Sequence, residues 1–390
     1  MRRISGGRNS RIGQRAPETG AVGLRCEWVM IPALRPHPHR SNAAAGRPIP
    51  PPTSSTHPDP LARPPGRPHD GAAGRGAVMP APTPVEGHAQ DRGTRESPVF
   101  VLAPARSCST SLVAMLSGHD RIYGFPELLL FGATTVAELL DEATRRPNLP
   151  KSRVEARLSG PLRAVAEIHE GRQDAPAVER AREWLEERRD WPTPRLFDHL
   201  RARLERCIAV EKSTETLMHP EGLRRCFAAF PDARYIHLVR HPVTTARSMR
   251  EQWRELFPSD GESELLERGA SAWYRGHLRA VSALASLPTG RWISLRAEDV
   301  LADPASHLPG VLDWLGLDGG DVALMKPTQE WVFAGAGDDD SAYGEDLGFL
   351  RSPETFPPSL PDARPREAFT GLPQAMVEEI GRLARHLGYM

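Results

Sequence analysis

The contrast between apolar and polar positions is sharpest between residues 99 and 116. Val99 to Ala103 is a short, β-branched apolar run that ends at Pro104, which is typical of a buried strand. A polar turn from Arg106 to Thr110 follows, and apolar residues from Leu112 to Leu116 then recur at helical spacing. This stretch predicts a strand, a tight turn and a helix in succession.

Two further apolar runs alternate with helical patterns. Cys207–Lys212 and Arg234–Arg240 read as buried strands, with a short helix from His219 to Phe230 between them and another from Pro242 to Trp253 after them. This alternation predicts an α/β fold with a doubly wound, mostly parallel sheet flanked by helices. Ligands of such sheets bind beyond the carboxyl ends of the strands, where Arg106, Lys212 and Arg240 fall.

The remaining apolar residues follow helical spacing. Residues 133–206 predict several amphipathic helices that cover one side of the sheet or cap a pocket. A long helix is expected from about 262 to 287, and a final one from about Arg364 to Leu387 that packs back on the domain. The acidic loop at 335–344 and the charged run at 183–189 are expected to be solvated.

Composition changes abruptly near residue 97. Residues 1–97 are rich in Pro, Gly, Arg and Ala without a periodic apolar pattern, and they predict a disordered extension. An alternative hypothesis is that translation begins at Met79, which the intact mass of the native protein would test. The formal net charge is zero, so the composition predicts no nucleic-acid partner.

The cysteines and the hydropathy indicate where the protein works. The four cysteines show no paired spacing and no metal-ligand pattern, which predicts a reducing, cytoplasmic setting and no metal site. No run of eighteen apolar residues exists, and the Arg-rich start lacks the apolar core of a signal peptide. We therefore expect neither a membrane span nor a secretory signal.

The turn after the first strand has the chemistry of an anion site. A helix that follows a strand directs backbone N–H groups and its dipole at a ligand. Arg106 adds a fork of donors, and hydroxyls come from Ser109, Thr110 and Ser111. The Walker A glycines and lysine are missing, which disfavours an ordinary ATPase or kinase of that class. A plain strand-turn-helix unit without a ligand remains the alternative.

Arg240 and Ser248 form a second candidate constellation. Arg240 leaves the third strand, and Ser248 lies about two turns into the next helix, so that both side chains are able to hold one phosphate. The alternative is that Arg240 pairs with a nearby acid and Ser248 packs against its helix. The residues alone favour that alternative.

Three motifs together resemble a known family, the sulfotransferases that use 3′-phosphoadenylyl sulfate. The loop Ala-Pro-Ala-Arg-Ser-Cys-Ser-Thr-Ser-Leu (103–112) is similar to their 5′-phosphosulfate loop, and residues 230–249 are similar to their 3′-phosphate motif. Residues 296–317 resemble their C-terminal strand and helix. The segments Gly124–Glu127 and Glu211-Lys212 resemble the tyrosylprotein and bacterial polyketide-associated branches more than the cytosolic steroid and phenol enzymes.

The resemblance implies a fold related to P-loop kinases, over residues 98–390, and a sulfuryl transfer from 3′-phosphoadenylyl sulfate to an acceptor hydroxyl. It implies that Arg240 and Ser248 hold the 3′-phosphate. The 5′-phosphosulfate would be held by Arg106, Ser107, Cys108, Ser109, Thr110 and Ser111. Cys108 departs from the family's usual Gly, which crowds a backbone meant to approach phosphate.

The resemblance also implies catalytic roles. Glu127 falls where related enzymes keep a general base, and Lys212 where some keep a cation at the transferring group, with Arg106 beside it. Alternatively, Glu127 sits in the first turn of a helix begun by Pro126. His237 and His241 are rival bases, although a core position and a helix cap explain them equally well.

Other questions stay open at the level of sequence. Trp273 and Tyr274 either pack the core or line the acceptor pocket. The acceptor is either a small hydroxylated metabolite or a carrier-bound hydroxyacyl chain, with the helical region 133–206 shaping its pocket. A kinase-like phosphotransferase and a non-catalytic nucleotide-binding scaffold protein are the competing functions.

Overall fold

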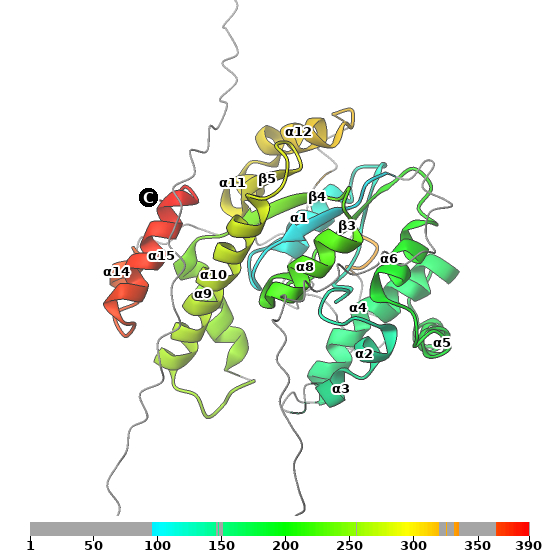
Figure 1. Ribbon diagram of the computed structural model, residues 1–390, viewed down its shortest axis with the longest axis horizontal. Helices are drawn as coiled ribbons and strands as arrows, with labels where there is room; N and C mark the ends of the chain where they lie inside the picture. Colours follow the sequence, from blue (N-terminus) through cyan, green and yellow to red (C-terminus); the bar gives the residue numbers. More distant parts are fainter. Residues whose placement is uncertain are drawn as a thin grey trace, which may run out of the picture. The chain divides into compact units, whose positions relative to one another are not determined.

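The computed structural model describes residues 96–145, 147, 151–254, 256–319, 325, 331–334 and 364–389. Their centre is a five-stranded parallel sheet in the order β2-β3-β1-β4-β5 (Figure 1). The strands are β1 (Val99–Leu102), β2 (Ile122–Gly124), β3 (Ile208–Glu211), β4 (Arg234–Val239) and β5 (Trp292–Arg296). The predicted doubly wound α/β sheet is confirmed, and β2 is a strand that the sequence pattern did not reveal.

The strand order explains why helices cover both faces of the sheet. The chain passes from β1 through α1 (Ser109–Leu116) to β2 on one side, then returns from β3 through α8 (Pro220–Ala229) to β4 on the other. Because crossovers between parallel strands are right-handed, these opposite directions of travel put α1 and α8 on opposite faces. The strand β1 therefore lies at the point where the winding reverses, which is where such sheets bind ligands.

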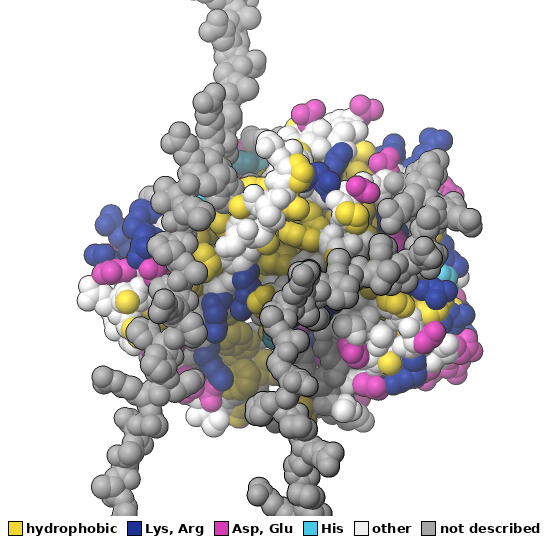
Figure 2. All heavy atoms as spheres, viewed as in Figure 1, with side chains coloured by type: hydrophobic (Ala, Val, Ile, Leu, Met, Phe, Trp, Pro, Cys, Tyr) yellow, Lys and Arg dark blue, Asp and Glu magenta, His cyan; other side chains and the backbone are white. Residues whose placement is uncertain are grey.

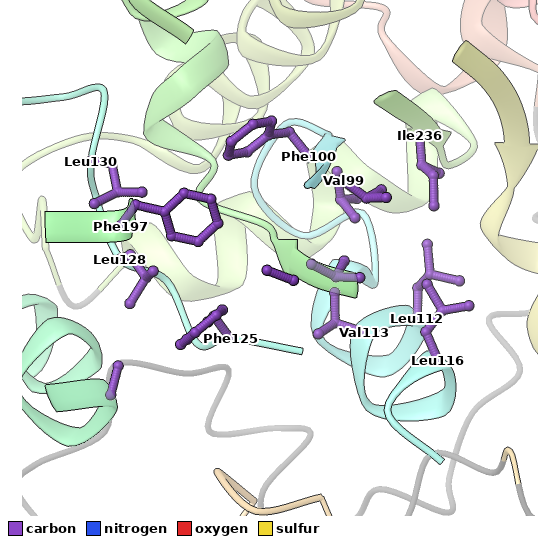
Figure 3. Close-up of a cluster of buried hydrophobic side chains, with 14 of the residues drawn as sticks. Val99, Phe100, Leu112, Val113, Leu116, Phe125, Leu128, Leu130, Phe197 and Ile236 are labelled. Atoms are coloured by element: carbon purple, nitrogen blue, oxygen red, sulfur yellow. The ribbon is translucent and has the colours of Figure 1, made fainter. Parts of the chain in front are cut away.

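The core is built around Phe100 of β1. Its ring lies 5.6 Å from that of Phe197 and 5.3 Å from that of Phe131, and Phe197 in turn contacts Phe125 (Figure 3). On the opposite side of the strands, Leu112 and other apolar residues of α1 are buried, as their helical spacing predicted. Burial of both faces accounts for the continuous apolar runs that identified the central strands.

The described part of residues 133–206 is mostly helical, as predicted, and its helices lie together at one end of the sheet (Figure 1). The helices of this region are α2 (Val136–Leu140), α3 (Glu142–Arg145), α4 (Lys151–Glu170), α5 (Ala175–Glu186) and α6 (Thr193–Arg201), and α7 (Glu215–Met218) follows β3. Arg157 of α4 joins α3 and α7 through ion pairs, each 2.7 Å long, to the buried carboxylates of Glu142 and Glu215.

The rest of the chain packs α9 (Pro242–Trp253) against the long helix α10 (Glu262–Leu284), and α11 (Ala297–Ala302) and α12 (Pro304–Leu315) follow β5. The single final helix expected from Arg364 to Leu387 is wrong. That segment forms α14 (Pro365–Ala368) and α15 (Gln374–His386), because Gly371 and Pro373 interrupt the helix between them.

Several predictions concern residues outside this description. The disordered extension, the start at Met79 and the acidic loop at 335–344 all fall there, apart from residues 96 and 97. Within the described ranges, no helix has both the length and the apolar character needed to cross a bilayer.

Candidate functional site

The loop after β1 has an unusual backbone. Arg106 and Cys108 both adopt φ of 64°, a left-handed conformation that suits glycine and costs other residues conformational energy. Cys108 is nevertheless buried, with its side chain in the main apolar cluster, and it precedes the first residue of α1. The turn therefore keeps the shape that a glycine would give, and Cys108 fits it by placing its side chain in the core.

Buried hydroxyls crowd the start of α1. Ser107 is 0% exposed, and its Oγ has no hydrogen-bond partner among the described residues. Ser109, Thr110 and Ser111 are also buried in the first turn, which contains no acidic residue. An unsatisfied buried hydroxyl is costly, so one at a helix N-terminus indicates a site that a bound anion completes. The donor set fits a phosphate or sulfate group.

Arg106, Ser248 and Arg240 contact one another directly. Arg106 Nε donates to Ser248 Oγ at 2.9 Å, and Arg240 Nη1 donates to the Arg106 carbonyl at 2.7 Å. The loop after β1 and the turn after β4 are therefore one structural unit. Lys and Arg side chains gather over α9 and α10 on the face shown in Figure 2. The alternative in which Arg240 pairs with an acid finds no such pair among the described residues.

The peptide that follows Arg240 is held on both sides. Trp273 Nε1, from α10, donates to the Arg240 carbonyl at 2.8 Å. The next N–H, of His241, donates to Glu298 Oε1 at 2.8 Å. Trp273 is fully buried, so it belongs to the core and also fixes the turn. Tyr274 instead points toward α15, where its hydroxyl donates to Glu379 at 3.4 Å.

Glu127 and Lys212 form the second half of the site. Lys212 Nζ lies 3.8 Å from Glu127 Oε1, and the lysine side chain is 1% exposed against 25% for the glutamate. Lys212 follows β3 and Glu127 lies shortly after β2, the neighbouring strand. Because β1 lies between β3 and β4, this pair and the Arg106–Arg240 unit leave the same edge of the sheet.

A buried carboxylate organises the segment that carries Glu127. Glu211 is 1% exposed and accepts hydrogen bonds from the N–H groups of Leu128, at 3.2 Å, and Ser213, at 2.9 Å, and from the Ser213 hydroxyl. Ser213 Oγ also accepts from the Leu129 N–H at 2.8 Å. Burial raises the pKa of Glu211 above its usual value, and its hydrogen bonds oppose that shift.

Helix α4 approaches the same segment closely. A Cβ added at Gly160 would lie 2.1 Å from the Glu127 carbonyl oxygen, so only glycine allows the two backbones to touch there. Residues 125–129 are not helical, and the alternative that Glu127 occupies the first turn of a helix begun by Pro126 is wrong. The hydrogen bonds to Glu211 and Ser213 satisfy these N–H groups in place of a helix.

The two histidines considered as bases are structural. His237 is buried in β4, and its Nε2 lies 2.9 Å from His277 Nδ1; desolvation lowers the pKa of His237 to about 3. His241 Nδ1 accepts from the Val243 N–H at 3.2 Å and so caps α9. Desolvation first, and then nearby arginines, lower the pKa of His241 to about 4. The core and capping interpretations are confirmed.

Comparison with known proteins supports the resemblance. Residues 98–321 match the model of the sulfotransferase family, which is more than half of the chain. The chain belongs to the sulfotransferase family. A search of curated protein sequences finds no match.

Two solved structures share the fold of this sulfotransferase. The sulfotransferase domain from the curacin biosynthetic pathway aligns with a TM-score of 0.57 at 22% identity, covering 76% of this chain and 99% of that domain. The sulfotransferase domain from the Synechococcus PCC 7002 olefin synthase aligns with a TM-score of 0.53 at 21% identity, covering 76% and 98%. At these identities the likeness concerns the fold.

Sequence reasoning missed several residues that build the site. Glu211 was seen only as part of a motif, and Gly160, Ser213 and Glu298 were not singled out. A carboxylate at the end of a buried strand was the available signal for Glu211, because such a group needs several donors. The contacts of Gly160 and Glu298 join segments far apart in sequence, and no local pattern marks them.

Proposed function

We propose that this sulfotransferase moves a sulfuryl group from 3′-phosphoadenylyl sulfate to an acceptor hydroxyl, and that it releases adenosine 3′,5′-bisphosphate. The observation that carries the proposal is that two turns with arginine and hydroxyl donors and a lysine–carboxylate pair lie together at one edge of the sheet. A donor with phosphates at both ends of its ribose requires two such turns.

The proposed donor contacts start from two buried atoms that lack a hydrogen-bond partner among the described residues, Ser107 Oγ and Arg240 Nε. Ser107 Oγ and the first N–H groups of α1, with the hydroxyls of Ser109, Thr110 and Ser111, would hold the 5′-phosphosulfate. Arg240, whose buried Nε has no hydrogen-bond partner among the described residues, would hold the 3′-phosphate with Ser248. Bound there, the donor supplies a sulfuryl group on a phosphate leaving group.

The proposed catalytic residues have different roles according to their charge. Glu127, the more exposed member of its pair, accepts the proton of the acceptor hydroxyl as general base. Lys212 and Arg106 stabilise the negative charge that builds on the transferring group and on the leaving oxygen. Positioning and electrostatic stabilisation of this kind are the main demands of phosphoryl transfer, which sulfuryl transfer resembles. We propose that no metal ion takes part.

The acceptor is proposed from chemistry alone. A hydroxylated small molecule and a carrier-bound hydroxyacyl chain both present the hydroxyl that Glu127 requires. The structural neighbours come from a biosynthetic pathway and an olefin synthase, which is compatible with either acceptor. We place the reaction in the cytoplasm and expect no nucleic-acid partner, because the net charge is zero and the three cysteines that the structure describes are free.

Nucleotide-dependent stabilisation tests the proposed donor. The melting temperature of the full chain is measured with adenosine 3′,5′-bisphosphate, with ATP and Mg²⁺, and without nucleotide. We expect a rise with the bisphosphate only, because a ligand that binds the folded state stabilises it. Stabilisation by ATP alone would indicate a phosphotransferase, and stabilisation by the bisphosphate without turnover on any acceptor would indicate a scaffold.

The variant Arg240→Ala sharpens that test. We expect its affinity for the bisphosphate, measured by calorimetry, to fall at least about tenfold, since charge-assisted hydrogen bonds to phosphate are strong. Arg254→Ala is the matched control, because Arg254 ends the same helix and is paired with Glu262 on the surface. Equal affinity in Arg240→Ala and the control would remove Arg240 from the donor site.

A further inference from the structure

The last described residue, Tyr389, is tied to the functional site. It follows α15, it is 8% exposed, and its hydroxyl donates to Glu298 Oε2 at 2.7 Å. Its ring packs edge-on against His241, with the centroids 5.3 Å apart, and the Arg296 guanidinium lies 4.6 Å from the ring centroid. The hydrogen bond is buried, so neither partner has water as a substitute.

Glu298 connects this tyrosine to the turn after β4. It lies in the first turn of α11 and is 4% exposed. One carboxylate oxygen accepts from Tyr389, and the other accepts from the His241 N–H at 2.8 Å. A change at Tyr389 therefore reaches His241 through a single side chain.

The peptide between Arg240 and His241 receives both of its anchors from distant elements. Its carbonyl accepts from Trp273 Nε1, and its N–H donates to Glu298. Because the peptide unit is planar, these two bonds fix its orientation, and that orientation sets where the Arg240 side chain leaves the backbone. Arg240 in turn reaches the carbonyl of Arg106 at 2.7 Å. Three elements thus fix the turn that bears Arg240.

We propose that Tyr389 is a positioning residue of the donor site, which acts through Glu298 to hold the Arg240–His241 peptide. The inference rests on the proposed function, because it takes Arg240 as a ligand of the 3′-phosphate. Tyr389 lies beyond residues 98–321, the part that matches the family. The contact between Tyr389 and Glu298 therefore depends on the C-terminal segment of this chain.

Tyr274 offers a matched control for the C-terminal contact. Like Tyr389, it is buried and joins the C-terminal segment to the body of the fold, because its hydroxyl donates to Glu379 of α15. The hydrogen bond described for its hydroxyl goes to α15 and not to the Arg240 turn. A role limited to anchoring α15 would make Tyr274→Phe and Tyr389→Phe behave alike.

The experiment compares wild type, Tyr389→Phe, Tyr274→Phe and Glu298→Gln. Calorimetry with adenosine 3′,5′-bisphosphate measures affinity, and steady-state kinetics separate the KM for the donor from kcat. In Tyr389→Phe we expect the dissociation constant and the donor KM to rise about five- to tenfold, with kcat at saturating donor unchanged, because a buried carboxylate oxygen loses its donor. Tyr274→Phe is expected to bind like wild type.

Glu298→Gln tests whether Tyr389 influences nucleotide affinity through Glu298. Glutamine keeps the size of the side chain but removes its charge, so the hydrogen bonds to the His241 N–H and to the Tyr389 hydroxyl lose their charge assistance, and affinity falls. The double variant is expected to bind no more weakly than the weaker single variant, since both changes break one chain of contacts.

Three results would overturn the inference. One is wild-type affinity in Tyr389→Phe, and another is an equal loss of affinity in Tyr274→Phe. Additive losses in the double variant would show that Tyr389 acts by another route. If the wild-type protein itself fails to bind the bisphosphate, the proposed function fails first and this inference fails with it.

Discussion

Cys108 combines a backbone conformation that suits glycine with a side chain that is buried in the core. The sequence predicts that this side chain crowds a backbone where related loops have glycine. The structure confirms the glycine-like conformation, with φ of 64°, and shows the side chain buried in the apolar cluster. Left-handed backbone costs a non-glycine residue about 1–2 kcal/mol, which the burial of a small apolar side chain offsets in part. The side chain that was expected to crowd the turn therefore packs into the core instead.

Glu127 carries the sharpest prediction at the scale of a residue. Glu127→Gln removes the proposed base while it keeps the size of the side chain. We expect kcat to fall by about 10²- to 10⁴-fold, the usual contribution of a general base, while affinity for adenosine 3′,5′-bisphosphate is retained. Single-turnover kinetics and calorimetry measure the two quantities.

Glu155→Gln is the control for that variant, because Glu155 is an exposed carboxylate on the neighbouring helix α4. It should turn over like wild type. Full activity in Glu127→Gln would exclude Glu127 as the base, and a parallel loss of nucleotide affinity would assign it to binding instead.

At the scale of elements, the position of Glu127 depends on a helix that packs against it. Gly160 of α4 touches the Glu127 carbonyl, and Pro161 follows within the same helix. Gly and Pro adjacent to each other weaken a helix locally, so their presence in a twenty-residue helix has a structural cause. For Gly160, that cause is the close approach of the α4 backbone to the Glu127 carbonyl.

Gly160→Ala tests this contact. The added Cβ would meet backbone at 2.1 Å, and backbone cannot rotate away as a flexible side chain can. We expect the free energy of unfolding, measured by urea denaturation, to fall by about 1–3 kcal/mol, and kcat to fall as Glu127 is displaced.

Gly381→Ala in α15 is the matched control. The Cβ added at residue 381 would have the end of the Arg385 side chain as its nearest neighbour, 3.8 Å away. The helical propensity of alanine should therefore raise the free energy of unfolding by up to about 1 kcal/mol. A Gly160→Ala protein as stable and active as wild type would disprove the packing argument.

At the scale of the whole molecule, the buried histidine pair makes stability depend on pH. Burial lowers the pKa of His237 to about 3 and puts that of His277 well below its usual value. Below about pH 6.5 these two histidines bind protons in the unfolded chain but stay neutral in the folded protein. The free energy of unfolding should therefore fall as the pH drops from 6.5 toward 3.

His277→Gln isolates this contribution. With one of the two groups removed, the decline in unfolding free energy between pH 6.5 and 5 should be shallower by up to about 1.4 kcal/mol per pH unit, the limit for one proton. Urea denaturation at several pH values measures it, and His307→Gln, at an exposed position on α12, is the control. An unchanged slope in His277→Gln would mean that the pair does not govern the acid side of the stability curve.

The sequence by itself determined the sheet's central strands, the turn after the first of them, and the positions of Arg106, Lys212 and Arg240 just beyond the strand ends. Those features are local, because apolar periodicity, turn residues and motif spacing are written in consecutive positions. It did not determine β2, whose three residues are too short for a periodic signal, nor the break between α14 and α15.

Only the tertiary structure decided which residues hold the site in place. Three sets of contacts do this: Gly160 against Glu127, Glu211 with Leu128, and Tyr389 through Glu298 to His241. Every contact among them joins positions at least 33 residues apart in the sequence. Such contacts arise when helices and strands pack, because packing brings together groups whose separation along the chain carries no repeat. The positions of the candidate site residues at the strand ends were therefore readable from the sequence, and the contacts that orient those residues were not.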